Sequence, residues 1–542
     1  MMRISILFRA LAPAWIATAA LYNQTINTAY GPVQGIAAFD SKPDTNFSNW
    51  RNITVWKGIP FAADTSGKNR WRLPQKRQAW NTTFAASEFG DTCPGQNSFG
   101  PMAKRQTGPG GDNSTSSSED CLNLNIWTAA SSTNEKLPVM IWSYPAGGSV
   151  AQPLFDGAGM AAKGVVFVNY NYRNAAFGWL AHPQLNAEML KEVGHNVSGN
   201  WAMLDQFAVL KWVHENIAAF GGDPERITVA GQSAGSAASY HMLNSPLTKG
   251  LIKGAIIESG IRYPRDPFCS SLAENYRNMS TALATGQTLM KSYNASTIDE
   301  LRQLSMAELN SYSASGFGAV LDYWAMPDTY LNTMLSGPAN DVPVLTGNTK
   351  DESGASLPIN VTVSEYIASL KSQYGDEFAS RFLSLLPASN STEAGISSNG
   401  RYAATSRVGT WLFANAWNKS PTKSPIYTYF WDHAPPGQTG GAYHESEINY
   451  VLDNLYGTNR PWVETDYLIA QKMSGYWANF VKTHDPNTGG MYSRPGQLAN
   501  WKSSTPNKTT VMRVGDGWGD VPVATDAQIE LFQYFFSKQK AY

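Results

Sequence analysis

The sequence predicts an α/β fold in which helices cover both faces of a large, mainly parallel sheet. Runs of apolar, β-branched residues alternate along the chain with segments of helical periodicity, which is the pattern of a doubly wound sheet. One of these runs leads through a glycine-rich turn directly into a helical segment. The 542 residues, of which 42% are hydrophobic and 15% charged, are enough to bury a large core.

The predicted strands are continuous apolar runs rather than alternating ones. Such runs are typical of strands that are buried on both faces of a sheet. They span residues 136–144, 164–172, 226–231, 254–260, 342–347 and 424–431.

The predicted helices fill the segments between these runs. Residues 199–221 carry apolar side chains at helical spacing and end at a glycine pair, and a small-residue helix begins at Ser233. Residues 265–335 and 355–410 are expected to be mostly helical insertions, and residues 526–542 a terminal amphipathic helix. Because neither an internal repeat nor a long linker divides the chain, we expect a single domain over residues 21–542.

The charge balance argues against several classes of partner. The chain has 41 basic and 42 acidic residues, so nothing favours binding to nucleic acid or to an anionic membrane surface. Beyond the N-terminus, no apolar run approaches the roughly 20 residues of a transmembrane helix, so no stable membrane anchor is expected.

The N-terminus predicts secretion. Arg3 precedes an apolar stretch, which Arg9 interrupts, and small residues at positions 17–20 are suited to cleavage, so residues 1–20 are read as a signal peptide. Many glycosylation sequons agree with an extracellular protein. They begin at Asn23, Asn46, Asn52, Asn81, Asn113, Asn196, Asn278, Asn294, Asn360, Asn390, Asn418 and Asn507.

The segment "ITVAGQSAGS" (227–236) predicts a nucleophile. A buried strand meets a tight turn that carries Ser233, and a helix follows at once. Small residues at Gly231, Ala234 and Gly235 let the strand and the helix approach closely. The Ser233 hydroxyl would then lie at the positive end of a helix dipole.

A serine needs a positioned base, and the order of the chain limits the choice. In enzymes with this strand–turn–helix nucleophile, the acid and then the histidine follow the serine. His241 lies on the helix of Ser233 itself, and His484 is placed to cap the end of a helix. His433 and His444 remain, and His444 is favoured because a flexible glycine stretch precedes it and a helix follows it.

The acid should follow a strand between the serine and the histidine. Asp351 and Glu352 both come just after the run at 342–347. Either carboxylate suits the role of holding the imidazole in one tautomer. The spacing does not distinguish Asp351 from Glu352. The alternative to a catalytic role for either is a solvent-exposed acidic turn.

Five segments together resemble the type-B carboxylesterases, the cholinesterase-like branch of the α/β-hydrolases. The resemblance covers nearly all of the mature chain and implies a large mixed sheet in one domain, a Ser233–Glu352–His444 triad, and neither a cofactor nor a metal. It therefore favours Glu352 over Asp351. The segments are "EDCLNLNIW" (119–127), with Asn123 where an aromatic residue is usual, "NYRNAAFGWL" (171–180), "FGGDPERITVAGQSAG" (220–235), "GNTKDES" (347–353) and "AYHESEINYV" (442–451).

Two of the three cysteines are expected to form a disulfide. Cys93 and Cys121 flank a loop rich in glycine and serine, and the resemblance implies the same pair. Closing such a loop stabilises a protein by about 3–4 kcal/mol in the chain-entropy model. Cys269 would then be either buried and inert or a free thiol. The loop lacks an apolar helical face, so it makes a poor lid, and lipolysis activated at a lipid surface is not expected unless other loops act as the lid.

In the family, backbone N–H groups of the loop at residues 143–150 help to form the oxyanion hole, which binds the negatively charged oxygen of the reaction intermediate. This loop departs from the family pattern. The family has three successive glycines here, whereas this chain reads "SYPAGGSV". Pro145 has no N–H to donate. Without a gap Pro145 and Ala146 replace the first two glycines, and with a one-residue insertion Gly147 and Gly148 are the donors. We favour the insertion, with Ala234 as the third donor.

Two other positions bear on the site. Many family members carry an acidic residue directly before the nucleophile, whereas this chain has Gln232, which disfavours cationic substrates such as choline esters. Ser259 is a candidate partner of the triad by resemblance, with an ordinary strand-end serine as the alternative.

The resulting hypothesis is a secreted serine esterase that hydrolyses small carboxylic esters of neutral, partly aromatic or apolar character through an acyl-enzyme. One alternative is an acyltransferase or cyclising enzyme that uses the same acyl-enzyme. The other is a catalytically inactive, cholinesterase-like binding protein.

Overall fold

The computed structural model describes residues 20–95, 115–268, 276–312, 316–352, 361–490 and 498–541. The predicted signal peptide, apart from Ala20, lies outside these residues, and so does most of the loop between Cys93 and Cys121. Cys269 and the sequons at Asn113 and Asn360 also lie outside them.

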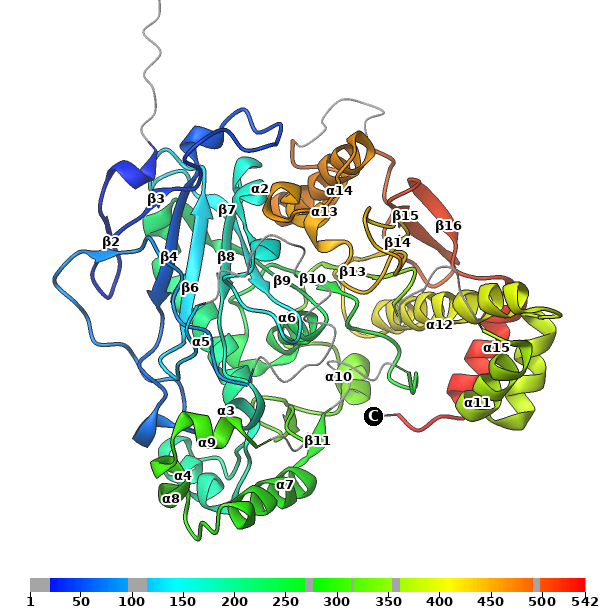
Figure 1. The fold of residues 1–542 in the computed structure, drawn as a ribbon, viewed down its shortest axis with the longest axis horizontal. Helices are drawn as coiled ribbons and strands as arrows, with labels where there is room; N and C mark the ends of the chain where they lie inside the picture. The colour runs from blue at the N-terminus through cyan, green and yellow to red at the C-terminus, as the bar shows by residue number, and fades with distance from the viewer. Residues whose placement is uncertain are drawn as a thin grey trace, which may run out of the picture.

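A large mixed sheet forms the centre of the protein, as predicted (Figure 1). Its strand order among the described residues is β16-β15-β14-β13-β10-β9-β7-β8-β6-β4-β3. All neighbours from β8 to β15 are parallel, and the pairs at both edges are antiparallel. The strands are β3 (Ile36–Ala37), β4 (Thr54–Pro60), β6 (Asn123–Thr128), β7 (Leu137–Ser143), β8 (Val166–Tyr170), β9 (Gly222–Gln232), β10 (Gly254–Glu258), β13 (Val344–Thr349), β14 (Ile426–Trp431), β15 (Thr510–Val514) and β16 (Gly519–Pro522).

Each of the six predicted apolar runs forms a strand of the parallel part, because continuous apolar sequence suits a strand that is covered on both faces. The strands β3, β4, β6, β15 and β16 were not predicted. β3 and β16 are short and only partly buried, and β4 and β6 pair with each other through a bulge between Trp56 and Ile59. Weak or interrupted patterns of this kind are hard to separate from loops.

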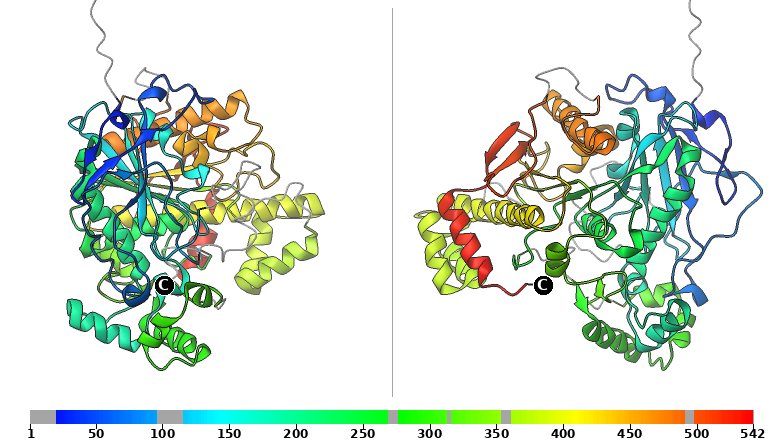
Figure 2. Two further views of the ribbon diagram at one scale, coloured as in Figure 1. Left: turned by 60° about the vertical axis from the view of Figure 1, so that its left-hand side comes forward. Right: turned by 180° about the vertical axis from the view of Figure 1, so that it is seen from behind.

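Helices cover the sheet on both faces (Figures 1 and 2). α5 (Trp201–Asn216), α6 (Ala234–Asn244) and α12 (Ser391–Lys419) pack on one face. α2 (Ala158–Ala162), α13 (Ile448–Leu452) and α14 (Glu464–Thr483) pack together on the other. α5 is buried on nearly all sides. The helical segment that contains it ends at Gly221, whose φ of 81° is left-handed, in agreement with the predicted end at a glycine pair.

The two insertions are mostly helical, as predicted. The first contains α7 (Met279–Ser292), α8 (Ile298–Gln303), α9 (Met306–Asn310) and α10 (Tyr330–Ser336), with the short strands β11 (Arg277–Asn278) and β12 (Val320–Leu321). The second contains α11 (Val363–Leu385) and α12. The terminal helix α15 (Asp526–Ser537) packs its aromatic face against α11, where Phe535 contacts Tyr374 and Phe378.

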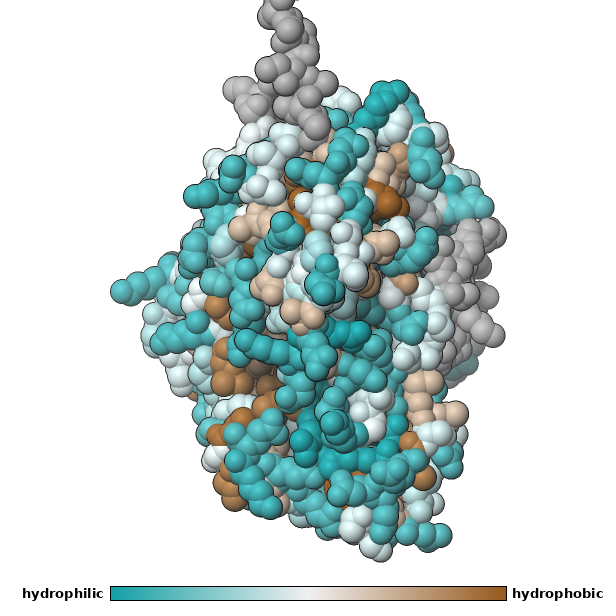
Figure 3. Space-filling view, turned by 90° about the vertical axis from the view of Figure 1, so that its left-hand side faces the viewer, coloured by the Kyte–Doolittle hydropathy of each residue, from teal (hydrophilic) through white to brown (hydrophobic). Residues whose placement is uncertain are grey.

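One face of the molecule shows how polar and apolar side chains are distributed on its surface. The face in Figure 3 is largely hydrophilic, with apolar side chains in small separate groups. In the described part of the chain, every helix is too short or too polar to cross a bilayer.

Candidate active site

Ser233 lies on a strained turn between β9 and α6. Its φ of 57° and ψ of −121° are unfavourable for a residue with a side chain, at a cost of order 1–3 kcal/mol. Its N–H donates to the carbonyl of Glu258 on the neighbouring strand β10 at 3.0 Å, which holds the turn in place. A Cβ at Gly235 would lie 1.8 Å from the carbonyl oxygen of Ser143, so only glycine lets α6 approach the sheet this closely.

The first turn of α6 leaves an amide that can bind a negative charge. Ala234 is the first residue of the helix, and its N–H donates to no acceptor among the described residues. Unpaired amides at a helix N-terminus, together with the helix dipole, favour anions. Ser233 and Ala234 thus lie at the start of this helix, as predicted.

His444 and Glu352 meet through a short hydrogen bond. Nδ1 of His444 lies 2.5 Å from Oε2 of Glu352. Glu352 follows β13, and its Oε1 accepts the N–H of Thr349 at 2.9 Å, while His444 lies in the loop between β14 and α13. With Nδ1 committed to the carboxylate, Nε2 is the nitrogen of His444 that remains for a proton transfer.

Asp351, the alternative acid, has a different role. Its Oδ2 accepts the N–H of Ala442 at 2.8 Å, and its own N–H donates to the carbonyl of Ala442 at 3.0 Å. Asp351 thus fastens the loop that carries His444 to the end of β13, and Glu352 faces the imidazole.

The other candidate histidines are engaged elsewhere. Nε2 of His433 lies 2.8 Å from Asp466 and Nδ1 lies 2.6 Å from Asp516. His484 ends α14 with a φ of 62°, as predicted for a cap. Burial lowers the pKa of His241 to about 4, and its ring contacts Tyr330.

The charges of the pair reinforce each other. Burial disfavours the imidazolium of His444, but the charge of Glu352 and the hydrogen bond between them outweigh burial and raise the pKa of His444 to about 9. For Glu352, burial is likewise outweighed by His444, with smaller contributions from the Ser259 hydroxyl and the Thr349 amide, so its pKa is lowered. The arrangement favours a proton on His444 and an ionised Glu352.

The loop after β7 forms a β-turn that uses the N–H of one of the predicted oxyanion donors. The N–H of Gly148 donates to the carbonyl of Pro145 at 3.0 Å, and Gly147 has a φ of 79°. Gly148 is therefore not a free donor in this conformation, because its one N–H is used inside the turn. The amides of Ala146 and Gly147 have no acceptor among the described residues.

A cavity of about 220 Å³ borders Glu352. Its lining is mixed, with aromatic rings, hydroxyl groups and one guanidinium that already pairs with the buried Asp266. The side chains include Arg262, Phe268, Tyr374, Tyr402, Thr405 and Ser406.

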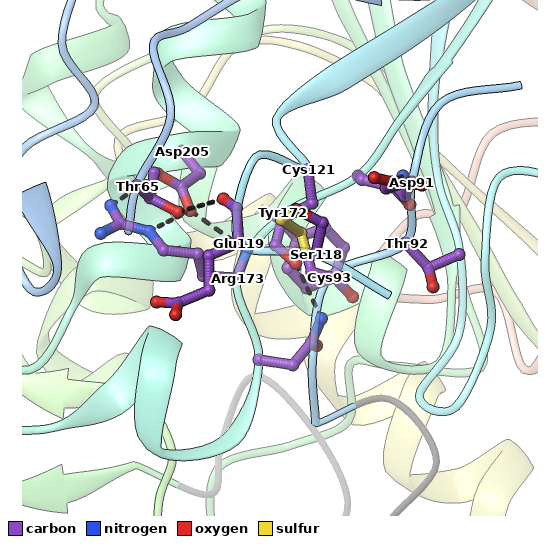
Figure 4. Close-up of a disulfide and its surroundings, with 12 residues drawn as sticks. Thr65, Asp91, Thr92, Cys93, Ser118, Glu119, Cys121, Tyr172, Arg173 and Asp205 are labelled. Atoms are coloured by element: carbon purple, nitrogen blue, oxygen red, sulfur yellow. Dashed lines mark hydrogen bonds and ion pairs between the residues drawn. A yellow bond between two sulfur atoms is a disulfide. The ribbon is translucent and has the colours of Figure 1, made fainter. Parts of the chain in front are cut away.

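The predicted disulfide is present (Figure 4). Cys93 and Cys121 are bonded, and their Cα atoms lie 5.0 Å apart. Beside it, Asn123 occupies the place where an aromatic residue is usual, and its Nδ2 donates to the carbonyls of Asp91 and Cys121. Figure 4 also shows the nearby buried pair of Arg173 and Asp205, which joins the loop after β8 to α5.

Sequence reasoning missed three buried polar side chains near the triad. Glu258, Tyr429 and Glu447 are at most 1% exposed. The available signal was a glutamate at the end of a buried strand and another three residues after His444. In the described part of the chain, no group of histidine, cysteine or acidic residues is arranged to hold a metal.

The chain is similar to known esterases over most of its length. The sequence profile described as "Carboxylesterase family" matches residues 22–521. Fumonisin B1 esterase of Sphingopyxis macrogoltabida is 33% identical over 472 residues, which cover 81% of this chain and 80% of that protein. Para-nitrobenzyl esterase of Bacillus subtilis (strain 168) is 29% identical over 489 residues, or 86% and 91% of the two chains. A solved structure titled PNB esterase superposes with a TM-score of 0.72 at 25% identity, over 94% of this chain and 99% of that chain.

Proposed function

The chain belongs to the carboxylesterase family and is a carboxylic ester hydrolase, and from this premise we propose that it is a secreted serine esterase with the triad Ser233, Glu352 and His444. The observation that carries the proposal is the place of the three residues in the sheet. They follow β9, β13 and β14, strands of one parallel set whose carboxyl ends lie at the same edge. The bond between His444 and Glu352 joins two of them directly.

In the proposed reaction, the Ser233 oxygen attacks the ester carbonyl as its proton passes to Nε2 of His444. Glu352 keeps the Nδ1–H of His444 oriented and stabilises the imidazolium that forms. The tetrahedral intermediate collapses to an acyl-enzyme, and the alcohol leaves with the proton from His444. Water then attacks the acyl group with His444 again as base, which releases the acid and restores Ser233.

For the oxyanion we propose the amides of Ala234 and Gly147, with Ala146 as the third donor. The occupied N–H of Gly148 supports this assignment, because a donor inside a turn would have to break that bond first. One oxyanion donor is typically worth about 10²–10³ in rate.

The proposed substrates are neutral esters with an aromatic or apolar part. Gln232 brings no charge to the residue before the nucleophile, and the cavity beside Glu352 carries aromatic and hydroxyl groups. Two relatives are named for esters of fumonisin B1 and of para-nitrobenzyl, which supports testing bulky and aromatic esters.

Secretion and glycosylation are also part of the proposal. The buried disulfide supports an oxidising compartment. Nine sequon asparagines of the described chain are exposed, namely Asn23, Asn46, Asn52, Asn81, Asn196, Asn278, Asn294, Asn390 and Asn507. Exposure is what a glycan needs.

The test compares the purified wild type with Ser233→Ala on p-nitrophenyl esters from acetate to palmitate. We expect turnover by the wild type and a loss of roughly 10⁶-fold in the variant. Ser239→Ala, on the same helix but bonded to the carbonyl of Gly235, is the matched control and should retain activity. Equal rates for wild type and Ser233→Ala would refute the triad, and product analysis with an added alcohol would reveal acyl transfer in place of hydrolysis.

A further inference from the structure

The second insertion contacts the end of β13 through helix α12. This helix packs against β13 and β14, and two of its polar side chains, Asn399 and Thr410, lie about three helical turns apart on one face. Nδ2 of Asn399 donates to Oδ1 of Asp351 at 2.8 Å, and the hydroxyl of Thr410 donates to Oδ1 of Asn348. The helix is therefore bonded twice to the segment that leads directly to Glu352.

Asn348 connects this helix to the proposed acid of the triad. Its Nδ2 donates to Oε1 of Glu352 at 3.3 Å, and the N–H of Thr349 donates to the same oxygen at 2.9 Å. The other oxygen of Glu352, Oε2, lies 2.5 Å from Nδ1 of His444. One carboxylate oxygen is thus held by the end of β13, and the other orients the imidazole.

The donor and acceptor properties of these groups fix the direction of the bonds. An ionised carboxylate only accepts hydrogen bonds, so Asn348 must present its NH₂ group to Glu352. The amide oxygen of Asn348 then needs a donor, which the hydroxyl of Thr410 supplies. The same hydroxyl lies 3.5 Å from the carbonyl of Ile261, and its one proton serves the closer acceptor, Asn348.

Both side chains are buried, so water cannot readily replace a lost bond. Asn348 and Thr410 are each 3% exposed. A buried polar group that loses its partner pays the full cost of desolvation, which favours any rotation that finds a new partner. The orientation of Asn348, and through it that of Glu352, should therefore depend on Thr410.

We propose that Asn348 and Thr410 are positioning residues of the triad. Thr410 fixes the amide of Asn348, and Asn348 holds Glu352 in the orientation that faces His444. Both act through Glu352 rather than on the substrate, and the inference rests on the proposed function of Glu352 as the acid. The second insertion then does more than cover the sheet, because its long helix sets the geometry of the acid.

Three variants test this chain of bonds. Asn348→Leu keeps the approximate size of the side chain but removes the donor to Glu352, and Thr410→Val removes the donor to Asn348. Because a misplaced acid misorients His444 while the ester still binds, kcat should fall roughly 10- to 100-fold in Asn348→Leu and about tenfold in Thr410→Val, with little change in KM. Thr410→Ser keeps the hydroxyl and should restore most of the wild-type kcat.

The measurement is steady-state kinetics on p-nitrophenyl acetate, together with the melting temperature of each variant. Thr333→Val is the matched control, because the buried hydroxyl of Thr333 on α10 donates to the carbonyl of Thr329 in its own helix at 2.9 Å. This variant should lower the melting temperature without changing kcat. A wild-type kcat in Asn348→Leu would overturn the proposal, and so would a Thr410→Ser variant as slow as Thr410→Val.

A second measurement does not depend on esterase activity. It records the NMR resonance of the Nδ1–H proton of His444 in the Ser233→Ala protein. A proton in a short bond to a carboxylate resonates far downfield, and we expect the signal to move upfield or to broaden when Asn348→Leu is added. An unchanged signal would overturn the positioning role. If Ser233→Ala hydrolyses esters as fast as the wild type, the proposed function fails, whereas a signal that responds to Asn348→Leu would still show that Asn348 holds Glu352 against His444.

Discussion

At the scale of single residues, the site depends on which polar atoms are not already engaged in other hydrogen bonds. Glu352 and Asp351 are adjacent in sequence, yet one carboxylate faces His444 and the other holds the backbone of Ala442. Likewise Gly147 and Gly148 are adjacent, and of the two only Gly148 donates its amide to an acceptor among the described residues. Neighbouring residues of the same type thus have different chemistry because the backbone turns between them.

We expect Glu352→Gln to lower kcat by about 10⁴, because an amide holds His444 in the wrong tautomer and no longer stabilises the imidazolium. The control is Asp351→Asn, which should stay within about tenfold of the wild-type kcat and change mainly the thermal stability. Steady-state kinetics on one short ester checks both. Similar losses in the two variants would contradict the assignment of Glu352.

The pH dependence follows from the raised pKa of His444. Because the base must be neutral to accept the Ser233 proton, and its pKa is raised to about 9, kcat/KM should rise with pH up to that value. Below the pKa, the rise should approach about tenfold per pH unit. A profile of kcat/KM between about pH 6 and pH 10 checks this, and a flat profile from neutral pH upward would show that His444 is already unprotonated there.

At the scale of elements, the strand–turn–helix around Ser233 is maintained by close packing. α6 approaches β7 so closely that Gly235 has no room for a methyl group. The strained turn persists because the neighbouring elements leave it no alternative. The disulfide likewise fixes Cys93 beside Cys121, just before β6, although the two residues are 28 positions apart in the chain.

Gly235→Ala should destabilise the protein by several kcal/mol, since the new Cβ would lie 1.8 Å from the Ser143 carbonyl. The matched control is Gly400→Ala in the interior of α12, where a Cβ meets nothing within 4 Å. That variant should be about 0.5–1 kcal/mol more stable than the wild type. Denaturant unfolding measures both free energies, and equal midpoints for the two variants would contradict the packing argument.

Cys93→Ser/Cys121→Ser should cost about 2–5 kcal/mol of stability, because the unfolded chain regains the freedom of the closed loop. The double variant avoids an unpaired thiol, and its thermal unfolding is compared with that of the oxidised and the reduced wild type. If the reduced wild type unfolds at the same temperature as the oxidised protein, the disulfide contributes little to stability.

At the scale of the whole molecule, the proposed triad residues follow parallel strands whose carboxyl ends lie at the same edge of the sheet (Figure 1), and the face of the molecule in Figure 3 is largely polar. The sequon asparagines of the described residues are exposed, with one partial exception. Nδ2 of Asn418, the atom that a glycan would modify, donates to the carbonyl of Ser504 at 3.0 Å, and the residue is only half-exposed.

We therefore expect glycans on several exposed asparagines of the secreted protein and none on Asn418. Peptide mass spectrometry before and after enzymatic deglycosylation measures the occupancy at each sequon. Asn507, exposed in a nearby loop, is the internal comparison. Full occupancy at Asn418 would show that the end of α12 forms only after glycosylation.

The sequence by itself determined six of the seven described parallel strands, the nucleophile turn and the helix that follows it, and it predicted His444 as the base, because each rests on local periodicity, turn chemistry or chain order. The family resemblance added Glu352 and the disulfide partners. Only the tertiary structure decided that the amide of Gly148 is bonded inside a turn while that of Gly147 has no acceptor among the described residues, that Asp351 fastens a loop, and that Glu258 and Glu447 are fully buried. These features depend on contacts between residues far apart in the chain, such as Glu258 with Trp477, and no local pattern encodes which distant groups will share a buried site.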